Sequence, residues 1–448
     1  MTLVTANEWS DVPLSPWHGS AIDRHAAEQL LRVAQASKLG GRDGARILVD
    51  NHRKLRTQGM VGVIASPAIT LEILPKIDPS EGDAVARTRL VEMLSVAFDL
   101  PIDAERISRM NLQQETLLEV LIRRFCDLVF AALQRGLPRR YVQQADDLRA
   151  LRGRLDVTRQ FTLLAADPSK LACRFDALSA DIPLNRIVKA AISRLRTLAR
   201  APDNDRRLSE LLFAYGQVNV TPGKSLRWDD LALDRTNRGW HIVISLAQLL
   251  LGSRFQTADA GQHHGFALVF DMGKLFERYV GKLLVRSLQG LDVNVCLQGP
   301  RNYLLDVIDE DQRGDKTSSF MTKPDIVVRR HGVPVMIADT KWKMLSAGME
   351  DKQHDIKESD VHQMLAYAHV YDVSRLLLIY PHHPNLNSTD ELLVSRYVRG
   401  TVDRRLYAAT LSLSGGASVT QRLMHLALTF GLSGDGAEPA QNIASAAS

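Results

Sequence analysis

Two short apolar runs near the end of the sequence, each bordered by an aspartate, most constrain how this chain can fold. The first run, residues 326–328, follows Asp325, and the second, residues 333–338, ends at Asp339. Only a short turn separates the runs, so we expect two strands that pair as a hairpin and build part of a core. This pairing would bring the two carboxylates close together.

The residues at this end of the predicted hairpin have the chemistry of a divalent-cation site. Mg²⁺ prefers hard oxygen ligands, which Asp325 and Asp339 provide. Because side chains alternate along a strand, Lys341 shares a face with Asp339 while Thr340 faces away. A lysine in that position can stabilise charge on a phosphate or help to activate an attacking water. The pattern therefore indicates a nuclease.

Two similar short patterns elsewhere show how specific this arrangement is. Aspartates often mark the ends of strands, so the two acids could have a purely structural role. Pro202-Asp203 is not followed by an acid-x-lysine pattern in the right window, and residues 355–357 lie in a polar stretch. Only Asp325 with Asp339 and Lys341 combines the spacing with apolar strands, which favours the nuclease interpretation over the structural one.

Two predicted helices flank the hairpin and could complete the site. On residues 274–288, Glu277 projects along an apolar stripe, where a carboxylate is costly unless a metal, water or access to solvent compensates it. On the second helix, Asp360, Gln363 and Tyr367 share one face, which could also be its solvated side. A strongly apolar strand follows, so the order of elements is that of a compact α/β nuclease core.

The length of 448 residues implies two or three domains, each able to bury a core. Short strand-like runs open the chain, and residues 145–255 are predicted to be mostly helical. The expected fold class is an α+β N-terminal region, with a small β-rich part and a helical middle, followed by a C-terminal α/β core. We predict a β-rich and helical domain over 1–145, a helical domain over 146–260, the nuclease core over 261–430 and a disordered tail over 431–448.

Charge and cysteine usage set weaker bounds on function. The formal net charge of +5 suits a polyanionic partner without establishing one. The three cysteines show no metal-ligand spacing, and reduced thiols are the simplest interpretation. The longest apolar stretch, residues 241–251, is too short to span a bilayer, and we find no secretion signal. We therefore expect a cytoplasmic protein that does not associate with membranes.

The sequence offers little support for nucleotide binding or for other hydrolase classes. Residues 222–225 look like the end of a phosphate-binding loop, but the required first glycine would fall at Val218. The chain is therefore expected to bind no nucleoside triphosphate by itself. Two adjacent histidine pairs, at 263–264 and 382–383, are better interpreted as loop residues than as zinc ligands.

Taken in order along the chain, the motifs resemble those of the McrC family, the nuclease subunit of McrBC modification-dependent restriction systems. The resemblance runs from the strand at 73–77 to the strand after Arg375. Thr340 and Gly273 depart from the usual pattern, but neither removes a metal ligand or the lysine. The motifs are Arg135-Gly136-Leu137 with Tyr141, then Leu151–Arg154, Asp181–Arg186, Phe270–Glu277, Asp339–Lys343, and the helix face of Asp360, Gln363 and Tyr367.

The resemblance implies a PD-(D/E)xK endonuclease that works with a GTP-hydrolysing AAA+ ring similar to McrB. GTP would be used by that partner, which carries or recruits the reader of modified cytosine in double-stranded DNA, such as 5-methylcytosine. The N-terminal portion of this chain would dock into the ring and stimulate its hydrolysis, and the C-terminal portion would cut the DNA with Mg²⁺. The predicted catalytic residues are Asp325, Asp339, Lys341, Glu277 and Gln363, and the predicted Mg²⁺ ligands are Asp325, Asp339, Glu277 and the Thr340 carbonyl.

Two other functions stay open from the sequence. A stand-alone repair or mobile-element nuclease would share the core but need no motor, and would cut DNA with Mg²⁺ alone. A chiefly regulatory subunit would stimulate the GTPase of the ring without cutting. The intact set of Asp325, Asp339 and Lys341 argues against pure regulation.

Overall fold

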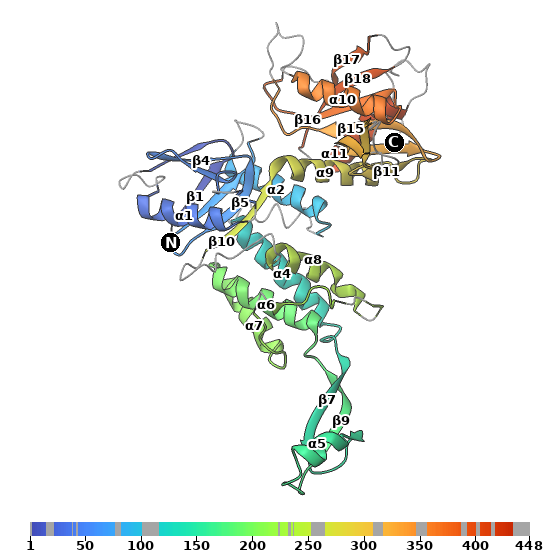
Figure 1. The fold of residues 1–448 in the computed structure, drawn as a ribbon. Helices are drawn as coiled ribbons and strands as arrows, with labels where there is room; N and C mark the ends of the chain where they lie inside the picture. Colours follow the sequence, from blue (N-terminus) through green and yellow to red (C-terminus); the bar gives the residue numbers. More distant parts are fainter. Residues whose placement is uncertain are drawn as a thin grey trace, which may run out of the picture. The chain divides into compact units, whose positions relative to one another are not determined.

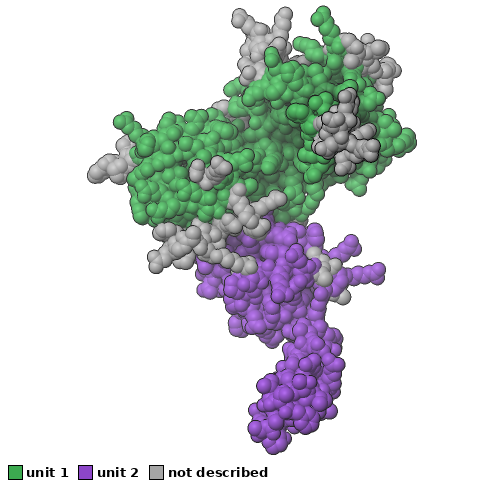
Figure 2. All heavy atoms as spheres, viewed as in Figure 1, with its two compact units in different colours: residues 1–114, 263–448 green, residues 115–262 purple. Residues whose placement is uncertain are grey.

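The computed structural model divides into two compact units (Figures 1 and 2). The first unit comprises Met1–Gln114 and His263–Ser448, and the second comprises Glu115–Gln262. The second unit is thus an insertion in the sequence of the first. The structure describes residues 2–14, 22–37, 39–41, 44–76, 82–100, 116–222, 225–231, 234–235, 237–251, 265–307, 317–345, 356–386, 392–399, 404–413 and 417–432.

The N-terminal part of the first unit is built on a mixed sheet in the order β1-β6-β5-β10. β1 is parallel to β6, and β5 is antiparallel to both of its neighbours. Helix α1 and a small sheet in the order β2-β4-β3 complete a common apolar core. The short strand-like runs expected at the start of the chain include β5 and β6. The elements are β1 (Thr2–Asn7), β2 (Asp11–Pro13), α1 (Arg24–Ala36), β3 (Leu48–Asp50), β4 (Lys54–Thr57), β5 (Met60–Ala65), β6 (Ile69–Leu74) and α2 (Asp83–Ala97).

Strand β10 (Phe266–Asp271) closes this sheet although it follows the inserted unit in sequence. The sequence-based division assigned these residues to the C-terminal core. They join the N-terminal sheet instead because their apolar side chains are buried there, beside β5. Gly62 makes the close pairing possible, since its φ is +134° and a Cβ would lie 2.0 Å from the Leu268 carbonyl oxygen.

The C-terminal part of the first unit is a mixed sheet in the order β11-β14-β15-β16-β18-β17. The predicted hairpin is confirmed as β14 and β15, which pair antiparallel, while β15, β16 and β18 run parallel. A separate two-stranded ribbon, β12 with β13, lies between β11 and β14 in sequence. The strands are β11 (Asn294–Leu297), β12 (Asn302–Val307), β13 (Thr317–Thr322), β14 (Ile326–Arg330), β15 (Val333–Thr340), β16 (Arg375–Pro381), β17 (Leu392–Tyr397) and β18 (Arg405–Leu411).

Helices cover both faces of this sheet (Figure 1). Helix α10 (Glu358–Val370) buries Met364 and Tyr367 against Ile337 and its neighbours, as the apolar strands require. Helix α9 (Met272–Ser287) contacts β15 and packs with α11 (Ala417–Leu426), which is followed by the π-helix η3 (Ala427–Leu432). The predicted helix at 274–288 is therefore confirmed as α9, and the predicted helix that carries Asp360, Gln363 and Tyr367 is confirmed as α10.

The second unit combines four packed helices with a long hairpin. Helix α4, which the sequence placed at the end of the first domain, packs against α7 and α8 in this unit. Residues 145–255 are less helical than predicted, because β7 and β9 form a nine-residue antiparallel pairing. Most side chains of β7 are exposed, so the apolar alternation that signals a strand is missing. The elements are α4 (Leu117–Leu133), β7 (Arg140–Leu148), β8 (Arg154–Leu155), α5 (Val157–Thr162), β9 (Leu171–Ser179), α6 (Pro183–Leu198), α7 (Pro202–Ala214), η2 (Arg238–Trp240) and α8 (His241–Leu251).

Two further expectations concern membranes and the C-terminal tail. Over the part of the chain that the structure describes, none of the helices has the length and apolarity to cross a bilayer. Of the predicted disordered tail at 431–448, the first two residues end η3, and the others lie outside the described residues.

Candidate active site

The two aspartates that border the predicted hairpin meet at one end of the C-terminal sheet. Asp325 directly precedes β14, and Asp339 lies at the end of β15, opposite it in the antiparallel pair. Asp339 is 1% exposed, and Asp325 is half-buried. The acids lie at the edge of the core because the apolar residues of both strands are buried in it, as the sequence predicted.

Asp325 is held by the residue after Asp339. Its Oδ2 accepts hydrogen bonds from the Thr340 backbone nitrogen at 2.9 Å and from Thr340 Oγ1 at 3.0 Å. Burial raises the pKa of Asp325, and the two Thr340 donors partly offset that effect. Thr340 thus orients the Asp325 carboxylate, whereas the predicted role of its carbonyl as a metal ligand stays a prediction.

A chain of polar contacts connects Asp339 to helix α10. The Lys341 ammonium lies 2.7 Å from Asp339 Oδ2 and donates a hydrogen bond to Gln363 Oε1 at 2.8 Å. Gln363 in turn donates to the Tyr367 hydroxyl at 2.8 Å. The structure therefore brings the predicted residues Lys341 and Gln363 together, and it places Tyr367 behind them. Asp360 lies one turn earlier on α10, where Tyr380 donates to its Oδ2 at 3.4 Å.

Glu277 reaches the same cluster from helix α9. The Gln298 side-chain amide nitrogen donates a hydrogen bond to Glu277 Oε1, and the Lys323 ammonium donates to the Gln298 side-chain oxygen Oε1. Gln298 also uses its backbone nitrogen to bond the Asp325 carbonyl oxygen at 2.7 Å. Gln298 and Lys323 were not predicted, because Gln298 lies in a turn far from the hairpin in sequence. The position of Lys323, two residues before Asp325, was the only available signal.

Burial raises the pKa of all three carboxyl groups, and the charge of Asp325 raises those of Glu277 and Asp339 further. Burial, followed by the charge of Asp325, raises the pKa of Glu277 to about 7. The same two causes raise the pKa of Asp339 to about 6. For Lys341, burial lowers the pKa, but the neighbouring Asp339 carboxylate more than offsets this, so the pKa is raised overall. The site is thus a half-buried concentration of negative charge next to one persistent cation.

The donor set fits Mg²⁺. No group of three or more His, Cys, Asp or Glu side chains is arranged as a ready-made metal site within the described residues. Mg²⁺ does not require one, because it commonly binds one or two carboxylates and keeps several waters. Asp339 Oδ2 is a buried carboxylate oxygen that faces the Lys341 ammonium at 2.7 Å, so this carboxylate is held at the site. Asp325 and Asp339 would hold the ion, whereas the role of Glu277 as a ligand stays a prediction.

We expect this site to lower the free energy of unfolding of the metal-free protein as the pH rises from about 4 to 7. The folded-state pKa values of Glu277 and Asp339 are raised to about 7 and about 6, so the folded protein holds these protons more tightly than the unfolded chain does. The stabilisation is complete below the unfolded values and is lost as the pH passes through the folded ones. Thermal unfolding in EDTA across this range should show a weaker pH dependence for Asp339→Asn than for the wild type; equal dependence would contradict the prediction.

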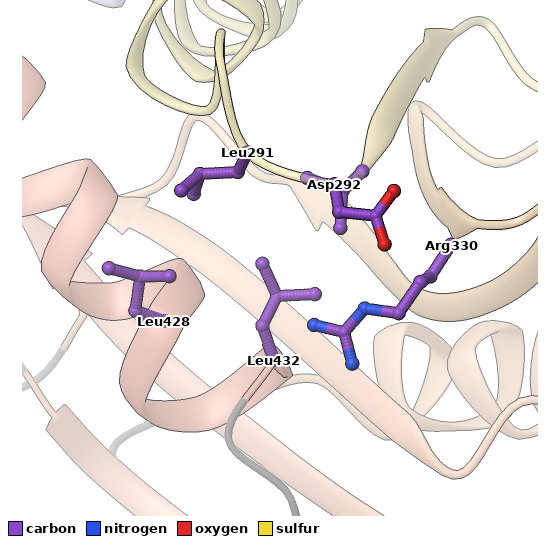
Figure 3. A pocket seen from close by; sticks show the side chains of 6 residues that line it. Leu291, Asp292, Arg330, Leu428 and Leu432 are labelled. Carbon is purple, nitrogen blue, oxygen red and sulfur yellow. The ribbon is translucent and has the colours of Figure 1, made fainter.

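A hollow elsewhere in the C-terminal part of the first unit lacks comparable chemistry. It lies at the end of β14 remote from Asp325, and Figure 3 shows leucine side chains facing Asp292 and Arg330. Its mainly apolar lining offers one acid and one base, with no cluster of ligands. The residues that line it are Leu291, Asp292, Val293, Arg330, Leu428 and Leu432. The carboxylate cluster at the other end of the hairpin remains the candidate site.

Comparisons with known proteins show the family and the fold of this chain. The sequence matches the model of a family described as McrBC 5-methylcytosine restriction system component over residues 55–381. No curated protein sequence matches the chain. The fold resembles a chain in the refined half-complex from a tetradecameric assembly of Thermococcus gammatolerans McrB AAA+ hexamers with bound McrC. That likeness has a TM-score of 0.70 and 20% identity, over 95% of this chain and 99% of that one.

A second solved structure is similar over a smaller part of the chain. It is the cryo-EM structure of the Thermococcus gammatolerans McrBC complex, with a TM-score of 0.50 and 23% identity. The match covers 64% of this chain and 88% of that one. At these identities the likeness concerns the fold.

Proposed function

Because this chain belongs to the family of McrBC 5-methylcytosine restriction system components, we propose that it is the DNA-cleaving subunit of such a system. The observation that carries the proposal is the convergence of Asp325, Asp339 and Lys341 at one end of a buried hairpin. Two acids beside a lysine are what phosphodiester hydrolysis with a divalent cation requires. A purely structural pair of strand-end acids would not need a buried Asp339 paired with a lysine.

The core is proposed to be of the PD-(D/E)xK type. Pro324-Asp325 before β14 and Asp339-Thr340-Lys341 at the end of β15 supply the two halves of that pattern. Glu277 on the preceding helix and Gln363 on the following one face the same end of the sheet through their hydrogen-bond partners. The order of these residues along the chain and their positions in the fold therefore both support a nuclease core.

The residues of the site would divide the work as follows. Asp325 and Asp339 bind Mg²⁺, which when present supplies Lewis-acid stabilisation and a more acidic water. Lys341 keeps its proton at neutral pH, because its pKa is raised, and so stabilises negative charge on the phosphate rather than removing a proton. Gln363 fixes the direction of the Lys341 ammonium. Glu277, with a pKa of about 7, can accept or release a proton at the edge of the cluster.

The proposed partner is an AAA+ ring of the McrB kind, which uses GTP and whose hydrolysis this chain stimulates. The hairpin of the second unit supports a protein-binding role, because it exposes large apolar side chains that a solvated hairpin does not need. Tyr141, Phe161 and Leu163 are each more than 70% exposed there. We therefore place ring docking on this hairpin, whereas the sequence placed it on residues 1–145. Selection of DNA that carries 5-methylcytosine is assigned to the partner.

Metal removal tests the nuclease assignment. With its partner ring, GTP and methylated duplex DNA, the protein is expected to cut in Mg²⁺, to stop in EDTA and to recover when Mg²⁺ is restored, because two carboxylates without the cation repel the phosphate. The measurement is strand cleavage on a gel, with unmethylated DNA as the control substrate.

Other results of the same assay would favour the competing functions. Equal cleavage with Mg²⁺ but without the partner and GTP would indicate a stand-alone nuclease. Stimulated GTP hydrolysis with no cleavage under any of these conditions would indicate a regulatory subunit and would overturn the proposal.

A further inference from the structure

A buried glutamate in the N-terminal sheet region is bonded to the catalytic segment. Glu8 follows β1, is 1% exposed, and accepts a hydrogen bond on Oε1 from the Trp342 indole nitrogen at 2.8 Å. Trp342 is the residue directly after Lys341. The contact joins residues that are 334 positions apart in the sequence, so it connects the first strand of the chain to the end of β15.

Trp342 also contacts the helix that carries Glu277. Its ring packs against Phe276, with ring centroids 5.2 Å apart and planes inclined at 59°. Phe276 is the residue directly before Glu277 on α9. One side chain therefore lies between the lysine segment and the glutamate helix of the candidate site, and its polar edge is held by Glu8.

The cost of burying Glu8 indicates that the contact has a purpose beyond packing. Its second oxygen, Oε2, is buried and has no hydrogen-bond partner among the described residues. Burial raises the pKa of Glu8 to about 7, although bonds from the Lys76 backbone and from Trp342 lower it. An incompletely satisfied buried carboxylate is destabilising, and an apolar side chain of similar size would avoid that cost.

If Glu8 acted only within the N-terminal region, only half of these contacts would be explained. Glu8 Oε1 also accepts from the Lys76 backbone nitrogen at 3.0 Å, which would by itself fix the segment after β6. That bond does not require Trp342 to turn its indole nitrogen towards the N-terminal region. It also does not account for the packing of the same ring on Phe276 beside Glu277.

We propose that Glu8 is a positioning residue for the cleavage site, acting through Trp342 on Lys341 and on helix α9. The N-terminal sheet region would thereby set the distance between Lys341 and Glu277. A displacement of that region would loosen the site without touching any residue that contacts DNA. The inference rests on the proposed nuclease function, but the contact itself is testable without cleavage.

The cleavage test compares variants that break or keep the hydrogen bond. Glu8→Leu and Trp342→Phe each remove one partner, and we expect the cleavage rate of the complete complex to fall about 10-fold while DNA affinity is unchanged. Because they break the same bond, the double variant should lose no more than either single one. Glu8→Gln keeps an oxygen that can accept from Trp342 and should retain nearly the full rate.

A matched control separates positioning from general destabilisation. Glu72 is another fully buried glutamate of the same region, and it pairs with Arg87 at 2.6 Å rather than with the catalytic segment. Glu72→Leu should lower the unfolding temperature but leave the cleavage rate of the folded protein unchanged. An equal loss of rate in Glu72→Leu and Glu8→Leu would overturn the proposal.

The contact can be followed directly in the absence of DNA. The sequence has five tryptophans, so a nitrogen-15 spectrum shows few indole signals, and the Trp342 signal is assigned by its loss in Trp342→Phe. We expect its indole proton to exchange slowly in the wild type and in Glu8→Gln, and rapidly in Glu8→Leu. Unchanged exchange in Glu8→Leu would overturn the link itself, whereas a wild-type complex that cuts no DNA would overturn the proposed function. Normal cleavage by Glu8→Leu with rapid indole exchange would also overturn the positioning role.

Discussion

Replacing Lys341 with alanine is expected to reduce DNA cleavage at least about 100-fold, the loss typical of removing one preorganised group that stabilises a charged transition state. Lys341 is the cation that contacts Asp339 at 2.7 Å and is held by Gln363. The measurement is the cleavage rate of the complete complex in Mg²⁺ and GTP. GTP hydrolysis by the ring should be unaffected, because the variant leaves the second unit intact.

The control for this variant is another lysine near the same helix. Lys357 is the exposed N-cap residue of α10 and donates no capping bond through its side chain. Lys357→Ala removes the same charge and should leave cleavage close to the wild-type rate. Cleavage by Lys341→Ala at that rate, with an unchanged unfolding temperature, would mean that the reaction is carried by other residues.

Replacing Gly62 with alanine is expected to destabilise the first unit by about 3 kcal/mol or more, the combined size of backbone strain and of a steric overlap that cannot relax. The glycine φ of +134° is unfavourable for any other residue, and the new Cβ would lie 2.0 Å from the Leu268 carbonyl oxygen. Since that oxygen is backbone of the paired strand, β10 would have to move away from β5. Thermal unfolding, with hydrogen exchange of the β5 and β10 amides, measures the effect.

Gly290→Ala is the matched control for strain alone. Its φ of +91° is also in the left-handed region, but a Cβ there would meet no atom within 4 Å. We expect a loss of about 1 kcal/mol, because only the backbone preference is violated. If both variants lost the same stability, the close approach of β10 to β5 would not be the cause.

Local patterning was enough to predict the hairpin of the candidate site. The apolar residues between Asp325 and Asp339 form two short runs joined by a short turn, and strand alternation alone places Lys341. The register of β14 with β15 then follows from the buried side chains. Glu277 and Gln363 were placed correctly on helices by the same reasoning, because the apolar faces of α9 and α10 are continuous.

The contacts that complete the site depend on tertiary structure, so they leave no local pattern in the sequence. Gln298 lies in a turn at φ +54°, and nothing in its neighbours distinguishes it from any exposed glutamine. Glu8 is separated from Trp342 by most of the chain. Strand β10 has the apolar composition of a strand, yet composition does not say which sheet it joins. The hairpin of β7 and β9 was missed because β7 is mostly exposed and lacks the apolar alternation of a half-buried strand.

The insertion of the second unit has a consequence for synthesis on the ribosome. About 190 residues separate the end of β6 from the start of β10, so at ordinary elongation rates β5 waits roughly 10 to 40 s for its neighbour. During that interval one edge of β5 is unpaired and can associate with another nascent chain. Early folding of the inserted unit would bring the two parts of the first unit together sooner. Slow or failed folding of Glu115–Gln262 would therefore increase aggregation of the N-terminal segment Met1–Gln114, which is synthesised first.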